Sequence, residues 1–433
     1  MLVDVLVDVL VVGGGPAGLS AAAELRRLGV GSVLVAEREA EAGGVPRHSW
    51  HTGYGLRDRH RVMTGPAYAR ALAGAAVAAG AELRLATTVT GSVSGHAVTL
   101  TSARGIETVQ AQAVLLATGC RERPRAARLV PGDRPTGVMT TGELQQRVYL
   151  SQEPRPGRAL IVGAEHVSFS AALTLSHAEA QVVALVTEYE RQQSYAAFRL
   201  GAAVRWRVPV WTSTRVRRVI GRGELAGVEV EDVRTGAVRF VPCETVVFTA
   251  DWVPDYELAR TGGLSMDAGT GGPSVDAALE TSAAGVFAAG NLVHAAETAD
   301  IAALSGQHAA RHMARVLNGP ALKGHALKGP ALKGRARVNR LPVHVEPPLR
   351  WISPNAVVFR GHSGSWAPPP LGRFVLRSQE FRRLARLEVR QDGRLLARSR
   401  PGRMVPGRPV HLGAAWLAQA DQAGGPVTVA VGS

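Results

Sequence analysis

Three glycines near the start of the chain have the spacing of a turn that binds a dinucleotide. An apolar run over residues 5–12 leads directly into Gly13-x-Gly15-x-x-Gly18. Gly13 permits a tight turn, Gly15 lets the backbone approach a pyrophosphate, and Gly18 lets the following helix pack on the strand. Glu37 follows roughly 20 residues later, where a carboxylate can accept hydrogen bonds from the ribose of an adenosine. These residue types and spacings therefore predict a dinucleotide site.

This chemistry requires a strand, a turn, a helix and a second strand at the N-terminus. We expect strands over 5–12 and Ser32–Glu37, and a helix from Pro16 to about Leu28. The N-terminus of that helix would face the phosphates of the ligand. Further candidate binding residues in this part of the chain are Pro16, Ala17, Arg38, Gly43 and Gly44.

Two later apolar runs end in residues that suit the same ligand. One ends in Thr118 and Gly119, and the other, which spans residues 281–291, ends in Gly290 and Asn291. With the N-terminal unit, these segments resemble the FAD domain of the thioredoxin reductase-like flavoproteins, which contain two dinucleotide domains. The resemblance extends to about residue 318 and implies FAD as the cofactor.

The resemblance also implies roles for the residues around Asn291. The family usually carries an acidic residue at this position, where it hydrogen-bonds a ribitol hydroxyl. An asparagine can accept through its amide oxygen and can also donate, so FAD binding is still expected. We expect a helix over Thr298–Met313, and in the family the start of this helix points at the flavin pyrimidine edge. Its dipole would favour the anionic reduced flavin there.

The middle of the chain resembles a second dinucleotide domain whose turn is altered. Residues 159–164 have the pattern of a strand and turn with Gly163 in place, but Glu165 and Ser168 stand at the second and third glycine positions. A carboxylate at position 165 would repel a pyrophosphate. Glu188, at the end of the next strand, would favour NAD over NADP. Whether this domain uses NAD(P) at all is left open by the sequence, and a structural lobe is slightly favoured.

The two cysteines exclude one activity of the resembling family. Thioredoxin reductases need a Cys-x-x-Cys pair beside the flavin, whereas this chain has only Cys120 and Cys243. Thioredoxin reduction is therefore excluded, and we interpret Cys120 as a packing residue.

The loop after Gly44 carries the best candidates for substrate chemistry. It is rich in aromatic, histidine and charged side chains. In the resembling flavoproteins this stretch approaches the isoalloxazine ring of the flavin. His48 or His51 could take a proton as hydride leaves a C–H bond, because the pKa of an imidazole lies near neutrality. Arg47 could hold a carboxylate or phosphate of the substrate. These three are the candidate catalytic residues, although each histidine taken singly is more readily explained by packing or flavin contact.

This loop and the run over 131–142 are similar to those of flavin dehydrogenase subunits such as opine oxidase and hydrogen cyanide synthase. They are also similar to those of oxidoreductases associated with glycerol metabolism. The similarity implies oxidation of amino acids or related amines, with transfer of electrons to a partner or a membrane carrier. This chain lacks the cysteine-rich module that would hold an iron–sulfur cluster, so any cluster would lie elsewhere.

Composition and length fit a globular protein with several cores. The chain has 433 residues, 46% of them hydrophobic. We find no apolar run of about 18 residues that would span a membrane. Asp4 and Asp8 interrupt the N-terminal apolar run, which argues against a secretory signal, and a cytoplasmic location is expected.

Positive charge is concentrated at the C-terminal end. The net charge is +15, and residues 321–433 carry 16 arginines and 3 lysines against 5 acids. Before them, residues 319–334 repeat Ala-Leu-Lys-Gly three times, which favours a flexible linker. The remaining chain predicts a small all-β domain with a hairpin turn at Gln391–Gly393. Its expected strands are 356–360, 374–377, 387–390, 395–397 and 427–431.

The basic surface of this β domain has several possible partners. An acidic partner subunit or an anionic membrane surface would be attracted to it. Nucleic acid is not expected, because we see no recognised binding motif. A solvated arginine-rich face with no partner is an equally good interpretation.

These observations predict an α/β fold with two Rossmann-like dinucleotide-binding domains and a small C-terminal all-β domain. The expected boundaries are 1–140 with 265–318 for the FAD domain, 155–262 for the inserted NAD(P)-type domain, 319–337 for the linker and 338–433 for the β domain. The leading hypothesis is a homo- or hetero-oligomeric dehydrogenase or oxidase. It would move hydride from a small organic substrate to FAD and pass electrons to a partner, quinone or oxygen. The alternatives are an NAD(P)H-dependent flavin reductase and a non-catalytic FAD-holding scaffold. No metal site is predicted.

Overall fold

The computed structural model divides the chain into two compact units. Unit 1 comprises residues 1–47, 53–120 and 254–433, and unit 2 comprises residues 48–52 and 121–253. The described residues are 4–91, 96–152, 156–195, 208–295, 297–318, 340–360 and 365–432. The whole repeat at 319–334 and the expected linker over 319–337 lie outside them.

Unit 1 contains a sheet built around the predicted N-terminal strand. Strand β1 pairs in parallel with β2 on one side and with β8 on the other, and β19 adds in parallel to β8. The sheet contains β5 (Glu82–Arg84), β2 (Val33–Ala36), β1 (Val5–Val12), β8 (Gly105–Leu116), β7 (Ala97–Ser102), β6 (Thr87–Val89) and β19 (Val286–Ala288). Because β8 is parallel to β1 and antiparallel to β7, the edge made by β6 and β7 is an antiparallel addition to a parallel core.

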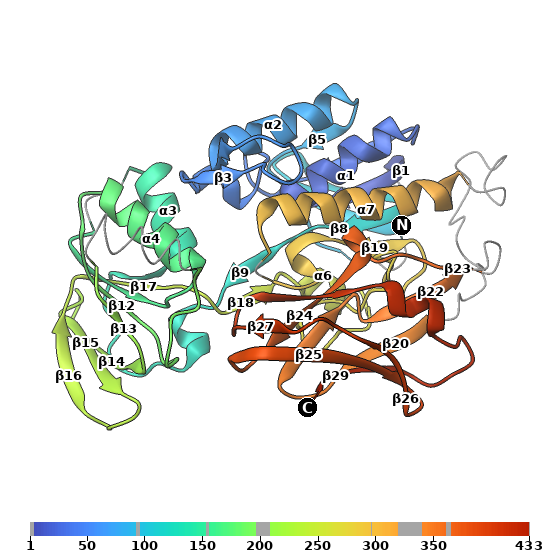
Figure 1. Cartoon of the computed structure of the whole chain (residues 1–433). Coiled ribbons are helices and arrows are strands. Elements are labelled where there is room, and N and C mark those ends of the chain that lie inside the picture. The colour runs from blue at the N-terminus through green and yellow to red at the C-terminus, as the bar shows by residue number, and fades with distance from the viewer. Residues whose placement is uncertain are drawn as a thin grey trace. The chain divides into compact units, whose positions relative to one another are not determined.

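The helices of this sheet begin where the sequence predicts. Helix α1 (Pro16–Arg27) agrees with the expected span, and helix α7 (Ala299–Leu317) starts one residue after the expected start and runs four residues past the expected end. Helix α2 is Gly65–Ala78. Helices α1 and α7 lie side by side (Figure 1). A Cβ at Gly306 would overlap the backbone of Ala17, so this glycine permits the close approach of the two helices.

The late strand of this sheet is shorter than predicted. Residues 281–291 were expected as one strand, but only Val286–Ala288 pairs, as β19. Gly285 has φ +75°, and Thr281 donates its hydroxyl hydrogen to the carbonyl of Val286 at 2.8 Å. A turn held by this hydrogen bond therefore precedes the strand.

The C-terminal β-rich segment is also part of unit 1. It contains β20 (Arg340–Val345), β21 (Leu349–Ser353), β22 (Ala356–Arg360), β23 (Ser365–Trp366), β24 (Arg373–Ser378), β25 (Arg382–Gln391), β26 (Arg394–Arg398), β27 (Gly402–Met404), β28 (Pro409–Gly413) and β29 (Val427–Gly432). All five predicted strands fall within these elements. The hairpin turn between β25 and β26 has positive φ at Asp392 and Gly393, as a type I′ turn requires. Phe374 and Trp416 are fully buried in the core of this segment.

An ion pair to a buried carboxylate and backbone contacts join the β-rich segment to the chain that leads into β19. Arg340 lies 3.0 Å from the carboxylate of Asp276, which is 3% exposed. Asn355 exchanges hydrogen bonds with the backbone of Val275, from Val275 N to Oδ1 at 2.9 Å and from its own N to the Val275 carbonyl at 3.2 Å. Val275 and Asp276, the residues contacted, precede β19 by about ten residues. The domain boundaries given above stay a prediction.

Unit 2 contains a parallel sheet with a smaller antiparallel sheet. The parallel strands are β10 (Val138–Thr140), β17 (Thr245–Phe248), β11 (Arg158–Val162), β12 (Gln181–Val186) and β13 (Val210–Trp211), and the antiparallel ones are β14 (Thr214–Ile220), β15 (Gly227–Asp232) and β16 (Val238–Pro242). Helices α3 (Thr141–Tyr149) and α4 (His166–His177) lie together on one side of this unit, and β14–β16 lie on the other (Figure 1). The predicted second Rossmann-like domain is therefore confirmed.

Short elements complete the chain. They are β3 (Thr52–Tyr54), β4 (Met63–Thr64), β9 (Cys120–Glu122), β18 (Trp252–Pro254), α6 (Glu257–Thr261) and the 3₁₀ turns Val45–His48, Arg125–Arg128, Gly290–Leu292, Pro370–Gly372 and Ala415–Gln419. Strands β9 and β18 pair with each other. Among the described residues, no helix combines the length and the apolar character needed to cross a bilayer.

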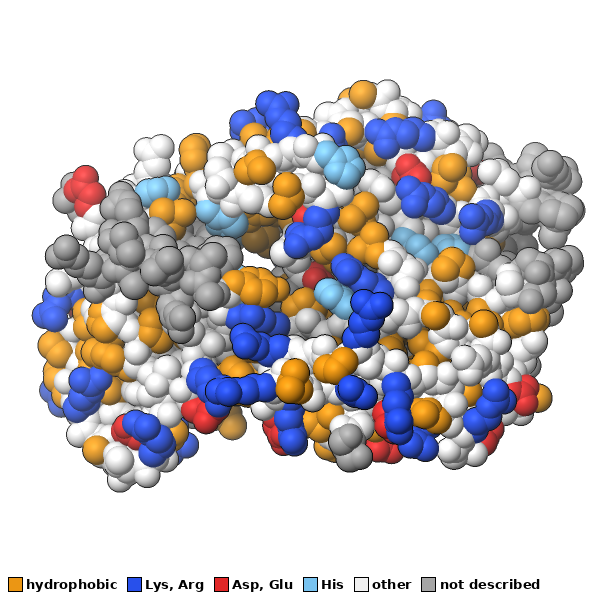
Figure 2. Space-filling view, viewed as in Figure 1, with side chains coloured by type: hydrophobic (Ala, Val, Ile, Leu, Met, Phe, Trp, Pro, Cys, Tyr) orange, Lys and Arg blue, Asp and Glu red, His pale blue; other side chains and the backbone are white. Residues whose placement is uncertain are grey.

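Arginines on the β-rich segment stand among acidic side chains. Figure 2 shows blue and red side chains close together over the lower part of this face. Glu388 pairs with both Arg390 and Arg398 at 2.8 Å, and Arg382 pairs with Glu380 at 2.7 Å. Acidic side chains on or next to β25 thus neutralise part of the positive charge that was expected to attract a partner.

Replacing Arg340 with methionine is expected to destabilise unit 1 by about 3 kcal/mol, because Asp276 would remain buried without its cation. Burial raises the pKa of Asp276 to about 6, and Arg340 opposes that rise. The loss should therefore be larger at pH 8, where the carboxylate is ionised, than at pH 5. Denaturant unfolding at the two pH values measures it. The same change at the exposed Arg383 serves as the control, and equal effects at both sites would contradict the assignment.

Candidate functional site

The glycine turn before α1 is closed on the protein side and open on the other. A Cβ at Gly13, whose φ is +106°, would lie 2.5 Å from the carbonyl oxygen of Ala117. A Cβ at Gly18 would overlap the carbonyl oxygen of Gly13. A Cβ at Gly15, in contrast, would meet nothing within 4 Å. The free backbone N–H groups at the start of α1 therefore face open space at Gly15, as a pyrophosphate site requires.

Glu37 lies beside this turn and is buried. Its Oε2 accepts a hydrogen bond from Gly14 N at 2.7 Å, and its Oε1 accepts one from Glu39 N at 2.8 Å. Arg38, the next residue, is exposed and lies 3.4 Å from the carboxylate of Asp255. The carboxylate predicted to bind ribose is thus positioned by the turn itself.

The other predicted residues of the first site converge on the same turn. Gly43 N donates to the Gly14 carbonyl at 2.7 Å, and a Cβ at Gly44 would lie 3.1 Å from Gly15 Cα. Thr118 donates its hydroxyl hydrogen to the carbonyl of Asp255 at 2.9 Å. Thr118 is the residue after Ala117, and the Ala117 carbonyl lies against Gly13.

Gly290 and Asn291 lie at the end of β19. Gly290 N donates to Ser305 Oγ of α7 at 3.1 Å. The amide of Asn291 holds the chain before α7: its Oδ1 accepts from Glu297 N at 3.0 Å and its Nδ2 donates to the Glu297 carbonyl at 3.2 Å. Asn291 stands where the family usually has an acid. Because an amide both donates and accepts, Asn291 can also hold the backbone of Glu297 from both sides, which a carboxylate could not do.

Sequence reasoning missed a buried charged group beside Asn291. Arg377 of β24 lies 3.3 Å from Glu297, and both side chains are less than one-tenth exposed. Burial raises the pKa of Glu297, and Arg377 opposes the rise. Burial, assisted by Arg377, lowers the pKa of the neighbouring His294 to about 3, so this histidine is neutral. The only local signal was the acid at position 297, since its partner is 80 residues away.

Replacing Arg377 with methionine is expected to loosen the segment between Asn291 and α7, because Glu297 would lose its buried cation. The flavin retained by purified protein should then fall by about fivefold, which corresponds to a contribution of about 1 kcal/mol from the pair to the loaded state. The flavin-to-protein absorbance ratio measures this effect. Arg386→Met, on the exposed side of β25, should keep the wild-type ratio. Unchanged retention in Arg377→Met would refute the role given to this ion pair.

In unit 2 the equivalent turn is filled by a side chain of the protein. Gly163 has φ +140° and follows β11, as the prediction requires. Glu165 is the N-cap of α4, and its carboxylate accepts hydrogen bonds from Val167 N, from Ser168 Oγ at 2.9 Å and from Thr249 Oγ1 at 2.7 Å. Burial raises the pKa of this carboxyl. A carboxyl group thus takes the position at the helix N-terminus that an anion would use. Glu188 is exposed after β12.

A second buried carboxyl lies near the first. Glu122 Oε2 accepts from Gly142 N, in the first turn of α3, at 2.8 Å. Burial raises the pKa of Glu122 to about 7, and the charge of Glu165 adds to the rise. Both helices of unit 2 that flank β11 therefore begin at a carboxyl group of the protein.

The pKa of Glu122 predicts how the stability of unit 2 depends on pH. A folded-state pKa raised from 4.5 to about 7 means that the folded state holds a proton that the unfolded state loses between these values. Stability should therefore fall as pH rises through this window, and Glu122→Gln should remove about 2–3 kcal/mol of the difference between pH 5 and pH 8. Thermal unfolding at both pH values tests this, with the exposed Glu143→Gln as the control. An identical pH dependence in wild type and Glu122→Gln would contradict the assignment.

The candidate catalytic residues are divided between the two units. Arg47, in unit 1, lies 3.4 Å from the carboxylate of Glu41. His48 and His51 belong to unit 2. His48 is buried with Nδ1 3.3 Å from Gln145 Oε1, whereas His51 Nδ1 lies 2.8 Å from the carbonyl of Thr52. Burial lowers the pKa of His51, which favours a neutral ring able to accept a proton. Their catalytic roles stay a prediction.

Both cysteines are free thiols. Cys243 is buried, and burial raises its pKa to about 11. Cys120 is half-buried. No redox disulfide can form within a Cys-x-x-Cys pair, because the sequence contains none.

Known proteins resemble this arrangement of two dinucleotide-type sheets. The sequence profile of the pyridine nucleotide-disulphide oxidoreductases matches residues 7–306. The chain belongs to this family. Its members bind FAD and NAD(P), and the chain is an FAD-dependent oxidoreductase.

Individual relatives cover different parts of the chain. Thioredoxin reductase of Treponema pallidum is 28% identical over 297 residues, which are 66% of this chain and 88% of that protein. Hydrogen cyanide synthase subunit HcnB of Pseudomonas aeruginosa is 34% identical over 159 residues, 36% of this chain and 32% of that protein, so this chain spans about a third of it. The crystal structure of Lactococcus lactis thioredoxin reductase covers 71% of this chain and 97% of its own, with a TM-score of 0.60 and 19% identity. The structural likeness shows the fold alone.

The residues of unit 1 fit FAD. The open face at Gly15 and the helix N-terminus would receive the pyrophosphate, and Glu37 would receive the ribose of the adenosine half. Thr118 lies beside Gly13, and Gly290 lies beside Ala17. With Gly119 and Asn291 they would hold the rest of the cofactor. These assignments of single residues stay a prediction.

Proposed function

We propose that this FAD-dependent oxidoreductase takes hydride from a small organic substrate, such as an amino acid, an amine or a polyol derivative. It then passes the electrons to a partner protein, a quinone or oxygen. The observation that carries the proposal is the carboxyl group of Glu165 on the N-terminus of α4. It competes with the pyrophosphate of NAD(P)H for the same N–H groups, and in its ionised form it also repels that ligand.

The cysteine content also argues against the thioredoxin reductase reaction. Without a Cys-x-x-Cys pair, the chain has no dithiol through which electrons could reach a thioredoxin. Electrons therefore leave the flavin by a route other than an internal Cys-x-x-Cys dithiol. The similarity to the subunit HcnB supports a partner protein as the acceptor.

The protein groups proposed for catalysis act on the proton and on the substrate. FAD, when bound, accepts the two electrons and the hydrogen of a C–H bond. A neutral His48 or His51 would take the proton from the substrate amine or hydroxyl, and Arg47 would hold a carboxylate. The lowered pKa of His51 supports its assignment as a base at neutral pH.

A reductase driven by NAD(P)H is the second candidate. It is favoured by the retained strand β11, by Gly163 with φ +140° and by the family's use of NAD(P). In that case the carboxyl of Glu165 would have to leave the helix N-terminus when the nucleotide binds.

Anaerobic titration separates the two candidates. NADH and NADPH should leave the visible flavin band of the wild-type protein unbleached, whereas an organic donor found among amino acids, amines and polyol derivatives should bleach it. Rapid bleaching by either nucleotide would overturn the proposal and establish the reductase.

Replacing Glu165 with glycine is expected to open the second turn. It removes both the bulk and the charge, so NADH should bleach the flavin of this variant at least about tenfold faster than that of the wild type. Glu165→Gln removes the charge but keeps the bulk, and a small effect there would identify bulk as the obstacle. If neither variant gains any response to NADH or NADPH, Glu165 is not what blocks the site.

A further inference from the structure

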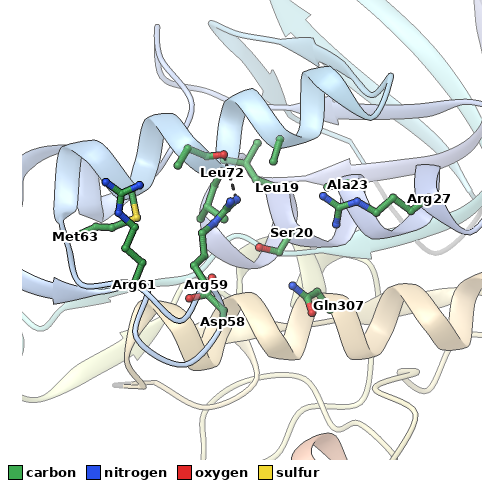
Figure 3. Close-up of a pocket in the computed structure, with 12 residues that line it drawn as sticks. Leu19, Ser20, Ala23, Arg27, Asp58, Arg59, Arg61, Met63, Leu72 and Gln307 are labelled. Atoms are coloured by element: carbon green, nitrogen blue, oxygen red, sulfur yellow. Dashed lines mark hydrogen bonds between the residues drawn. The ribbon is translucent and has the colours of Figure 1, made fainter.

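A cavity of about 370 Å³ lies beside α1, and no residue of the glycine turn lines it. Its walls come from α1, α2, α7 and the loop between β3 and β4 (Figure 3). A water molecule takes about 30 Å³ of liquid volume, so the cavity can hold a molecule much larger than one water. It has the size of a small-molecule site.

The inner wall carries buried polar atoms that have no partner. Ser20, in the second turn of α1, is 5% exposed, and its Oγ forms no hydrogen bond. Asp58 Oδ1 is likewise buried without a hydrogen bond, while Asp58 Oδ2 accepts from the Tyr68 hydroxyl at 2.7 Å. Figure 3 shows Ser20 and Asp58 directed into the same space, with the amide of Gln307 beside them. A hydroxyl, a carboxylate and an amide are the groups that bind ligand hydroxyls.

Unsatisfied polar atoms at this depth point to a ligand. A serine within a helix ordinarily hydrogen-bonds the carbonyl four residues earlier, and Ser20 does not. Leaving a buried hydroxyl unbonded costs about 1–3 kcal/mol, and a ligand hydroxyl would remove that cost. The geometry therefore favours a ligand that carries hydroxyl groups.

The outer wall is positively charged. Arg27 extends from α1 on one side, and Arg59 and Arg61 extend from the loop on the other (Figure 3). Arg59 donates to the Ala71 carbonyl at 3.1 Å. In the part of the chain that the structure describes, no carboxylate lies within ion-pair distance of Arg61. Arg27 also lies 3.9 Å from the carboxylate of Glu24 on the same helix. Three guanidinium groups thus stand beside two carboxyl groups, those of Glu24 and of Asp58, and burial raises the pKa of Asp58.

We propose that this cavity binds a small organic anion with several hydroxyl groups, a sugar phosphate or a sugar acid. The anionic group is held by Arg61 and Arg27 at the mouth, and the hydroxyl groups are held by the inner side chains Ser20, Asp58 and Gln307. A neutral sugar gains nothing from the guanidinium groups, and inorganic phosphate gains nothing from the inner wall. The proposal does not depend on the flavin chemistry, because the cavity has its own lining.

Isothermal titration calorimetry on the purified holoprotein tests the class of ligand. Glucose 6-phosphate and gluconate share a six-carbon polyhydroxylated skeleton and differ in the anion, so the one that binds identifies phosphate or carboxylate. We expect saturable binding of at least one of them, about tenfold or more tighter than that of inorganic phosphate and of glucose. No saturable binding of either compound, or equal binding of inorganic phosphate, would overturn the proposal.

Variants place the binding in this cavity. Ser20→Ala suits a helix and changes little volume, and Arg61→Gln alters an exposed side chain, so both should fold. Each substitution should lower the affinity for the bound compound by about tenfold. Arg70→Gln, which changes an exposed arginine of α2 outside the cavity, should bind as the wild type does. If both Ser20→Ala and Arg61→Gln, shown to be folded by thermal unfolding, bind like the wild type, the site lies elsewhere and the proposal fails.

Discussion

The close backbone packing at the start of α1 is the constraint on which the first site depends. Gly18 lies against the carbonyl of Gly13, and Gly306 of α7 lies against Ala17, with no room for a Cβ at either glycine. This packing fixes the N-terminus of α1 between the turn after β1 and the last helix of the sheet. Because the backbone is held from two sides, the open face at Gly15 keeps its N–H groups directed outward.

The two dinucleotide-type turns differ in what faces their helix N-terminus. At α1 the turn leaves open space, and the nearest carboxylate, Glu37, is engaged by Gly14 N. At α4 the carboxyl of Glu165 occupies the equivalent position, and at α3 Glu122 does so through Gly142 N. Both units contain a dinucleotide-type sheet, but the turns differ: one leaves its helix N-terminus open to an anion, and at the other a carboxyl group of the protein already occupies that position.

Two ion pairs to buried carboxylates fix the position of the C-terminal β-rich segment within unit 1. Arg340 pairs with the buried Asp276, which precedes β19 in the chain, and Arg377 pairs with Glu297, which follows it. Buried ion pairs contribute little net stability because both charges lose their water, yet breaking one leaves an uncompensated charge. The segment therefore supports the chain around Gly290 and Asn291 as well as presenting an arginine-rich surface.

The sequence by itself determined the local features. The turn at Gly13–Gly18, the helix that starts at Pro16 and the hairpin at Asp392–Gly393 depend on the conformations open to a few neighbouring residues, so their patterns could be recognised without any partner. Only the tertiary structure decided what the charged and polar side chains contact. Glu165 was recognised as an obstacle, but its hydrogen bond to Thr249 was not, because 84 residues separate them.

The same reason applies to the β-rich segment and to the cavity beside α1. The pairing of Arg377 with Glu297 spans 80 residues, and the cavity brings Ser20, Asp58 and Gln307 together from three distant segments. Hydrophobic periodicity specifies which face of an element is buried, but it does not specify which polar group from elsewhere will meet that face. That choice is made when the elements pack, since a buried charge or hydroxyl is stabilised only by the particular atoms that packing brings within reach.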